Sequence, residues 1–494
     1  MDAKILTQGF GFATYPSVKL MGKKKNKKGE YKFGFLKELL FGDYIKPIKH
    51  KDSGKIIKKT VKGKDYIRVR TRGKFGYVLP GQIQPNRVME INFVDIGQGD
   101  GCHIVTPEDE HYIIDAGKSD NMFRFLTWRF NLRYGDISPP KFTAIITHCD
   151  EDHYGGFTKL FTHQKKFKQL LKFEEILHNG IIEESGTSYS TLGTIVIDSD
   201  GDDYVTDLCR TDASCKKRIA NAKNPGRYIS LLKKATSSVK SLKYGDAPIY
   251  NKNGTKMEVL GPVVQKIKNK DALPILTKNK GKTKNGHSVI LKLTIGNLRL
   301  LLGGDLNSAS EEYLFKCFTN TDIKKLKKEI NNPKTKKTDV KKASDKIQQA
   351  ILKLRKGFEV DIAKSCHHGS PDFTNEFMQA VNPIATIISS GDEESHSHPR
   401  PETLGAIGKF GRGNRPLIFS TELARSAKEF MDTTNLSTYK KKERLVTVYG
   451  MINVRTDGDQ TIIAQKLEKP RSSNNWDINK LVWNKDKNRY EYIK

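Results

Sequence analysis

The sequence predicts a layered α/β domain preceded by a small β domain. Short apolar segments such as residues 142–146 and 385–388 are each followed by a polar loop that carries His, Asp or Ser. A segment with helical character, residues 122–132, follows another of these loops. Strands, polar loops and helices that alternate in this way are typical of layered α/β folds.

Length and composition exclude several classes of protein. The chain has 494 residues, of which 36% are hydrophobic, so a globular core in about two to four domains is expected. No run of about 18 apolar residues occurs, and the first residues lack the apolar region of a secretory signal. Six cysteines without a Cys-x-x-Cys pair argue against a disulfide scaffold or a zinc ribbon. We therefore expect a cytoplasmic protein without a membrane span.

The positive charge is large and concentrated. The net charge is +31 at pH 7, and basic runs lie at residues 23–28, 266–284 and 322–356. One such run is typical of a solvated surface, but three together favour a polyanion, most commonly nucleic acid. An anionic membrane surface is less favoured, because the runs lack an amphipathic aromatic face. The residues expected to contact nucleic acid are Lys324, Lys325, Lys327, Lys328, Lys336, Lys337, Arg68 and Arg70.

Residues 1–88 are expected to form the small β domain. Residues 66–72 alternate with period two, as a half-buried strand does, and a glycine turn leads into residues 75–80. This arrangement resembles the small barrels of bacterial Src-homology type.

Three arginines stand on alternate positions of this strand. Arg68, Arg70 and Arg72 are therefore expected on one face. Three like charges on one face repel each other unless an anion lies against them. The face is either solvated or a docking site for nucleic acid or an acidic partner protein.

The layered domain is expected over residues 89–465, with insertions near 180–285 and 318–358, and residues 466–494 are expected to form a basic C-terminal tail. Its predicted strands are residues 91–94, 111–114, 142–146, 288–293, 298–302, 360–364, 385–388, 445–450 and 461–464. Most of these strands end in loops that carry Asp or His. Loops at strand ends are the usual ligand sites of layered α/β folds.

The densest candidate cluster is His148-x-Asp150-x-Asp152-His153. Four such ligands within one loop suit two divalent ions, with His148 and Asp150 on one ion and Asp152 and His153 on the other. The alternative is a polar loop in which Asp152 caps a helix. That alternative is less favoured, because packed carboxylates without a cation are costly.

The segment from Thr147 to Gly156 resembles the second motif of the metallo-β-lactamase superfamily, which usually reads His-x-His-x-Asp-His. Asp150 stands here in place of its second His. Together with residues 95–100, 115–117, 304–305 and 367–370, this motif is similar to the ComEC-like branch of that superfamily, over about residues 90–465. The resemblance implies an αββα sandwich. It does not extend to the membrane channel of ComEC.

The resemblance also implies roles for later residues. Asp305 would bridge two metals, and either His367 or His368 would be the last ligand of the second metal. We slightly favour His367, because it follows the strand more directly. His287 is either a ligand of the first metal or a polar or substrate-contacting loop residue.

The remaining candidates support the site. Asp115 would orient the histidines from behind, while Asp95 and Asp100 would shape the loop beneath the metals rather than bind them. His398 either contacts the scissile phosphate or fixes its loop. Cys149 and Cys366 lie beside ligands in the sequence and are expected to pack away from them.

These expectations define a function. A hydroxide held by two metals, oriented by Asp152 or Asp305, would attack the substrate, and the charge favours a phosphodiesterase acting on DNA or RNA, that is, a nuclease. Zn²⁺ is favoured by the His ligands, and Mn²⁺ is the alternative. Two other functions stay open: a small-molecule hydrolase (lactonase or phosphoester hydrolase) and a nucleic-acid-binding adaptor with a degenerate metal site.

Overall fold

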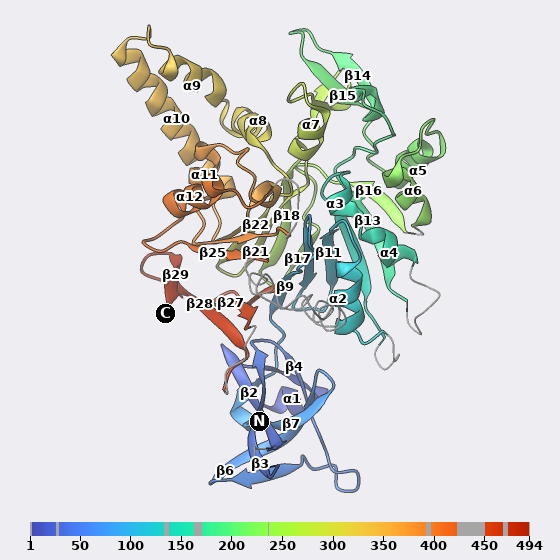
Figure 1. Ribbon diagram of the computed structural model, residues 1–494, viewed down its shortest axis with the longest axis vertical. Helices are drawn as coiled ribbons and strands as arrows, with labels where there is room; N and C mark the ends of the chain where they lie inside the picture. The colour runs from blue at the N-terminus through green and yellow to red at the C-terminus, as the bar shows by residue number, and fades with distance from the viewer. Residues whose placement is uncertain are drawn as a thin grey trace, which may run out of the picture. The chain divides into compact units, whose positions relative to one another are not determined.

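The computed structural model describes residues 2–25, 29–132, 138–162, 170–235, 237–391, 397–421, 450–467 and 473–493. The chain divides into two compact units. The first is Met1–Asn92 with Ile104–Glu110 and Met451–Lys494, and the second is Phe93–His103 with His111–Gly450. Figure 1 labels their helices and strands. The strand predicted over residues 445–450 lies almost wholly outside the described residues.

The N-terminal part of the first unit is a small β domain. Its elements are α1 (Ala3–Gln8), β1 (Gly11–Ala13), β2 (Ser17–Lys25), β3 (Tyr31–Leu40), β4 (Tyr44–Pro47), β5 (Lys58–Val61), β6 (Lys64–Thr71), β7 (Lys74–Val78) and β8 (Ile83–Gln84). The strands pair in the order β3-β2-β7-β6-β4-β1-β8, and β5 pairs with β6. Its identification as a barrel of Src-homology type stays a prediction.

The period-two pattern of residues 66–71 is confirmed, because Ile67, Val69 and Thr71 are buried in β6 while Arg68 and Arg70 alternate with them. The expectation for Arg72 was wrong. It follows the end of β6 with a φ of 43°, and its guanidinium pairs with Asp43 at 2.6 Å. The turn takes Arg72 out of the strand, so only two of the three arginines share the face.

The first unit also contains β9 (Met89–Phe93), β26 (Ile452–Thr456), β27 (Gln460–Lys466), β28 (Trp476–Asn484) and β29 (Arg489–Ile493). The last two strands lie in the segment that we expected to be a basic tail. These two strands contact the small β domain. The backbone N–H of Asn475, just before β28, donates a hydrogen bond to the carboxylate of Glu38 in β3 at 2.8 Å. Leu40, Phe41 and Trp476 share one buried cluster. The apolar residues Trp476 and Ile478 pack in or against this cluster, so β28 joins the sheet although it also carries Lys480.

The second unit contains a sheet with the order β16-β13-β12-β11-β10, from the strands β10 (Gly101–Val105), β11 (His111–Ala116), β12 (Lys141–Ile146), β13 (Lys172–His178) and β16 (Ser238–Ser241). The pairs from β11 through β16 are parallel. The last residues of β12 are apolar and buried on both faces, as a central parallel strand requires. Helices α2 (Asn121–Arg129), α3 (Glu151–Tyr154) and α4 (Phe157–Thr162) connect these strands.

A further sheet of this unit has the order β17-β18-β21-β22-β23-β24-β25, from β17 (Tyr250–Lys252), β18 (Thr255–Gly261), β21 (Ile290–Ile295), β22 (Leu298–Leu302), β23 (Ile362–Lys364), β24 (Ala385–Ile388) and β25 (Leu417–Ser420). Helices α8 (Ser308–Thr319), α10 (Lys337–Phe358), α11 (Asn375–Val381) and α12 (Pro401–Phe410) follow its strands. Leu354, Phe358 and Phe377 from the helices share a buried cluster with Leu301 and Ala363 from the sheet. The α/β class is therefore confirmed.

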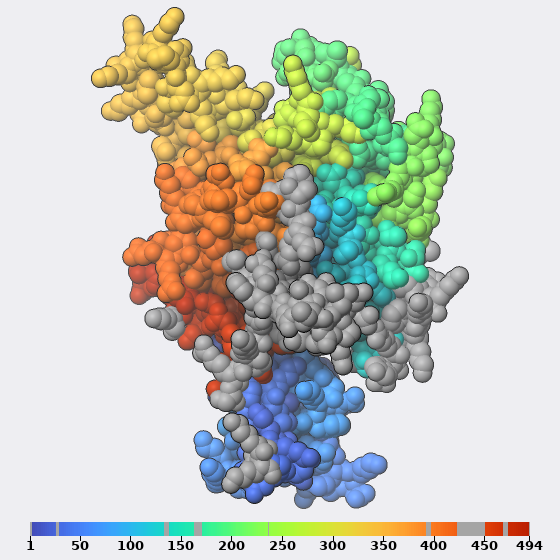
Figure 2. All heavy atoms as spheres, viewed as in Figure 1, coloured from blue at the N-terminus to red at the C-terminus, as the bar shows by residue number. Residues whose placement is uncertain are grey.

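The two predicted insertions contain regular structure. Residues 180–285 hold β14 (Thr194–Ile197), β15 (Asp203–Thr206), β19 (Gln265–Ile267), β20 (Lys270–Pro274), α5 (Asp212–Ala220), α6 (Arg227–Lys234) and most of α7 (Lys280–Gly286). The same range also contains β16, β17 and β18, which belong to the two sheets described above, so this stretch is not an insertion throughout. The other insertion forms α9 (Ile323–Asn331) and α10, drawn in gold, and Figure 2 shows this pair standing out from the rest of its unit. None of the helices in the described ranges is long and apolar enough to cross a membrane.

Glu311 of α8 gives a prediction for stability. Burial raises the pKa of Glu311 from 4.5 to about 8. Between these values the folded chain keeps a proton that the unfolded chain releases, so stability falls as pH rises from about 4.5 to about 8. Glu311→Gln should remove this fall and raise the free energy of unfolding at pH 8 by on the order of a few kcal/mol. Thermal unfolding of both proteins at pH 5 and pH 8 tests this. An identical pH dependence in the two would contradict it.

Candidate metal centre

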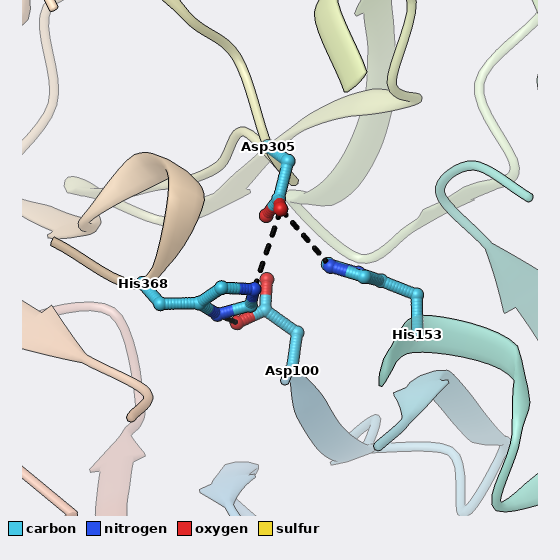
Figure 3. Close-up of side chains that lie close together, drawn as sticks. All are labelled: Asp100, His153, Asp305 and His368. Atoms are coloured by element: carbon cyan, nitrogen blue, oxygen red, sulfur yellow. Dashed lines mark hydrogen bonds and ion pairs between the residues drawn. The ribbon is translucent and has the colours of Figure 1, made fainter. Parts of the chain in front are cut away.

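Four buried side chains from different loops converge in the second unit. They are Asp100 before β10, His153 in α3, Asp305 after β22 and His368 after β23. One possible ligand atom from each lies within 4.8 Å of the others. Figure 3 shows both imidazoles turned toward the carboxylate of Asp305.

Asp305 lies between the two histidines. Its Oδ2 is 3.2 Å from Nε2 of His153 and 3.3 Å from Nε2 of His368. Asp152 approaches the same atoms, with its carboxylate 3.5 Å from His368 Nε2 and 4.0 Å from His153 Nε2. Asp305 thus lies between the two histidine rings, and Asp152 lies beside both.

The histidine nitrogens that face this space fit a cation. Nε2 of His148, His153 and His368, and Oδ1 of Asp305, are buried and have no hydrogen-bond partner among the described residues. Buried polar atoms usually have a partner, and leaving several together is costly. Imidazole nitrogen and carboxylate oxygen are the ligand atoms of zinc and related divalent ions. The residues present therefore suit a metal centre.

Asp115 holds His153 from the side opposite this space. Its carboxylate lies 2.7 Å from Nδ1 of His153 and accepts hydrogen bonds from the backbone and the hydroxyl of Thr147, at 2.8 and 2.6 Å. Burial lowers the pKa of His153, but the carboxylates of Asp305 and Asp115 outweigh it and raise that pKa well above its usual value. Such a contact fixes which ring nitrogen faces the metal space.

Asp115→Asn is expected to weaken metal binding by about 10- to 100-fold. The amide nitrogen would face the N–H of His153, so the ring would lose its acceptor, although the amide oxygen can still accept from Thr147. Competition with a chelator measures the affinity. Asp345→Asn, a change at an exposed position on α10, is the matched control. Equal metal affinity of the two variants would contradict the orienting role.

Asp150 lies at the edge of the cluster and is shared with a lysine. One of its oxygens is 3.7 Å from Nε2 of His148, and the other pairs closely with the ammonium of Lys284. Lys284 also pairs with Glu183 at 2.7 Å. Burial would raise the pKa of Asp150, but His148 and Lys284 lower it to about 2. Asp150 is thus an anion with one oxygen left for the metal space.

A second lysine lies beneath the cluster. Lys364 of β23 is buried, pairs closely with Asp100 and lies 3.8 Å from Asp305. Asp100 also accepts from Nδ1 of His368 at 3.1 Å. Asp100 was expected to lie beneath the metals without binding them, but its carboxylate is one of the four possible ligands of the cluster, where Lys364 balances its charge.

The placement of the other predicted residues varies. The cluster contains His368 rather than His367, contrary to our slight preference. Both residues have left-handed backbone, with φ of 48° and 55°, and this turn brings His368 to 3.3 Å from Asp305 and leaves His367 at 3.8 Å. We had favoured His367 because it is nearer to β23 in sequence. The left-handed turn at these two residues means that nearness in sequence does not decide which histidine faces Asp305.

His287 lies outside the cluster. Its Nε2 donates to the carbonyl of Pro274 at 2.8 Å, and burial lowers the pKa of His287 to about 4. Asp95 accepts from the Gly97 backbone at 3.4 Å, within its own loop. Burial raises the pKa of the thiols of Cys149 and Cys366, the latter to about 12. These thiols are protonated packing groups.

A cavity of about 290 Å³ opens onto the cluster. Its lining residues are Gln98, Lys118, Asp150, Glu151, Asp152, Asn285, Asp305, His367, His368 and His398. The ring of His398 lies 5.9 Å from that of His367. His398 thus lines the same cavity as the residues of the cluster.

Sequence reasoning missed the two lysines and Glu183. Lys364 had one signal, since it is a charged residue within an apolar strand that leads into the His367-His368 loop. Lys284 was hidden within a basic run. Glu183 carries no motif at all, and its partner Lys284 is 101 residues away.

Comparison with known proteins gives distant similarities. No family model matches the chain. It is 22% identical over 331 residues to ComE operon protein 3 of Bacillus subtilis strain 168. The aligned region covers 64% of this chain and 30% of that protein. The chain thus spans less than a third of that relative. It also aligns with the crystal structure of a metal-dependent hydrolase of the β-lactamase superfamily, with a TM-score of 0.29 and 11% identity, covering 67% of this chain and 95% of that one.

Proposed function

We propose that the chain is a metal-dependent hydrolase of the metallo-β-lactamase type, with two divalent ions at the Asp305 cluster. The observation that carries the proposal is the set of buried histidine nitrogens around Asp305 that have no hydrogen-bond partner among the described residues. The first ion would be held by His148, Asp150, His153 and Asp305. This moves His153 from the ion that the sequence predicted for it, because the centroid of its ring lies 4.1 Å from that of His148. The second would be held by Asp152, His368 and Asp305.

Divalent ions, when bound, supply the acidity that activates water and neutralise charge on the substrate. The chain's own residues divide the remaining work. Asp152 and Asp305 line the cavity, where a carboxylate would orient a water and accept its proton. His398 and Lys118 also line it, and these side chains would contact a phosphate oxygen of the substrate.

The proposed substrate is a phosphodiester of DNA or RNA. A small neutral substrate would not explain the net charge of +31. A phosphate backbone would, because it is a polyanion. On α9 and α10, Lys325, Lys328, Lys336 and Lys337 are exposed. Lys324 and Lys327 instead pair with Glu312 at 3.7 Å and Glu376 at 3.0 Å, so we assign the backbone contacts to the first four.

The same proposal includes the αββα order of layers, a cytoplasmic location and Zn²⁺ in preference to Mn²⁺. Three histidine ligands favour zinc. The four carboxylates nearby keep manganese as the alternative.

One experiment tests the function. The purified protein is assayed on labelled single- and double-stranded DNA and RNA with Zn²⁺, Mn²⁺ or EDTA, and on a lactone and a p-nitrophenyl phosphodiester. Metal-dependent cleavage of a nucleic acid is expected, with about two equivalents of metal per chain. Turnover of only the small substrates would replace the nuclease by a small-molecule hydrolase. Binding without any turnover would indicate an adaptor.

A further inference from the structure

One face of the small β domain carries exposed aromatic rings. Strand register places Phe75 of β7 opposite Arg70 of β6, and Tyr77 opposite Arg68. Tyr66 lies opposite Lys59 of β5, and residues directly opposite each other in an antiparallel pair share a face. We call this surface the aromatic-basic face and define its rings as Tyr31, Phe33, Tyr66, Phe75 and Tyr77.

The rings of this face are joined to one another and to cations. Phe33 packs edge-to-face on Tyr66 at 5.3 Å and on Tyr77 at 5.8 Å. Each cation lies over a ring, with Arg68 and Arg70 at 5.6 and 5.9 Å from the centroid of Phe75. Lys59 lies 5.1 Å from Phe33, and Lys25 lies 5.3 Å from Tyr31. The face therefore alternates flat apolar surfaces with positive charge.

Two of these rings are mostly in solvent. Tyr31 is 65% exposed and Phe75 is 54% exposed. Exposed large aromatics grouped in a patch usually mark a binding surface.

The acidic residues of the same strands do not neutralise the face. Asp65 lies on the opposite side of β6, where it accepts from Thr60 at 2.6 Å. Glu38 is buried and bonded to Ser17 and Asn475. Among the described residues of strands β2 to β7, these are the only acids.

We propose that the aromatic-basic face binds single-stranded nucleic acid, with bases stacked on Tyr31 and Phe75 and phosphates paired with Arg68, Arg70 and Lys59. Stacking on aromatic rings beside cations is the mode by which single strands are bound without sequence preference. In a duplex the faces of the bases are stacked on one another and cannot stack on protein rings. A duplex would therefore contact this face only through the cations. The proposal rests on nucleic acid being the substrate class proposed above, and it narrows that class to single strands.

Binding is measured on the full chain with EDTA present, so that hydrolysis does not interfere. The probe is a fluorescent oligothymidylate of about 16 nucleotides, compared with a duplex of the same length. Phe75→Ala is expected to weaken single-strand binding by about 5-fold or more and duplex binding by less. Phe75→Trp should retain the affinity, and its indole fluorescence should be quenched by the oligonucleotide. Tyr244→Ala removes a 46%-exposed ring elsewhere in the chain and is the matched control.

Two outcomes overturn the proposal. One is unchanged single-strand affinity in both Phe75→Ala and Phe75→Leu. The other is equal loss of duplex and single-strand binding, which would mean that only charge acts and would leave an acidic protein as the fitting partner. The experiment distinguishes a failure of this proposal from a failure of the nuclease proposal on which it rests. Oligonucleotide binding at Phe75 without any hydrolysis would refute only the nuclease, while hydrolysis of single strands unaffected by these variants would refute only the face.

Discussion

Asp305→Ala is expected to lower the metal content from about two equivalents to less than one and to lower hydrolysis by roughly 10³-fold or more. Asp305 is the only carboxylate of the cluster within 3.5 Å of both histidines, His153 and His368. Its removal leaves each remaining set of ligands one short. Elemental analysis of protein purified without chelator, together with the rate on the best substrate, measures both effects.

The control for this variant is Cys149→Ser. Cys149 is buried beside His148 in sequence, but its thiol approaches Glu183 rather than the cluster. Cys149→Ser should therefore keep its metal and its activity. Full metal content in Asp305→Ala, or hydrolysis by a metal-free protein, would show that the cluster is not the active site.

Replacing Lys325, Lys328, Lys336 and Lys337 by glutamine is expected to weaken nucleic-acid binding about tenfold or more, alike for all sequences. Each lost phosphate contact should reduce the slope of log affinity against log salt by about 0.9 for duplex or about 0.7 for single strands. Four contacts therefore change the slope by about 3.6 for duplex and about 2.8 for single strands. Titrations at several salt concentrations measure it.

A charge-matched control comes from the same unit. Lys217, Lys223, Lys233 and Lys234 are exposed at or near α5 and α6, and replacing them removes the same total charge. If both quadruple variants lose affinity equally, the charge acts as a whole and α9 and α10 have no special role. If neither changes, the lysines are solvated only.

The sequence predicted those parts of the site that depend on close spacing. His148, Asp152 and His153 lie close together in sequence, after β12 and in α3, so their proximity is assured by the chain itself, and Asp305 stands at the end of an apolar strand. The cluster also needs Asp100 and Lys364, and these depend on how β10 and β23 are placed in space. No local pattern reports such a distance.

The same distinction applies to the fold. The alternation in β6 and the apolar strands were readable because each pattern is local. Arg72 was misplaced because one residue with positive φ ends the strand, and residues 476–493 were taken for a tail because their lysines masked the apolar residues of β28. In both cases the contact is with a residue distant in sequence: Arg72 pairs with Asp43, and Asn475 beside β28 bonds to Glu38.

The first unit is assembled from stretches at opposite ends of the chain, and this has a consequence for synthesis. Leu40 and Phe41 pack on Ile462, Ala464 and Trp476, which leave the ribosome about 360 residues after the small β domain. At about 5–20 residues per second, this delay is roughly 20–70 s. During that time the apolar surface around Leu40 is uncovered on the nascent chain, so a chaperone has its best opportunity to bind there before the last strands arrive.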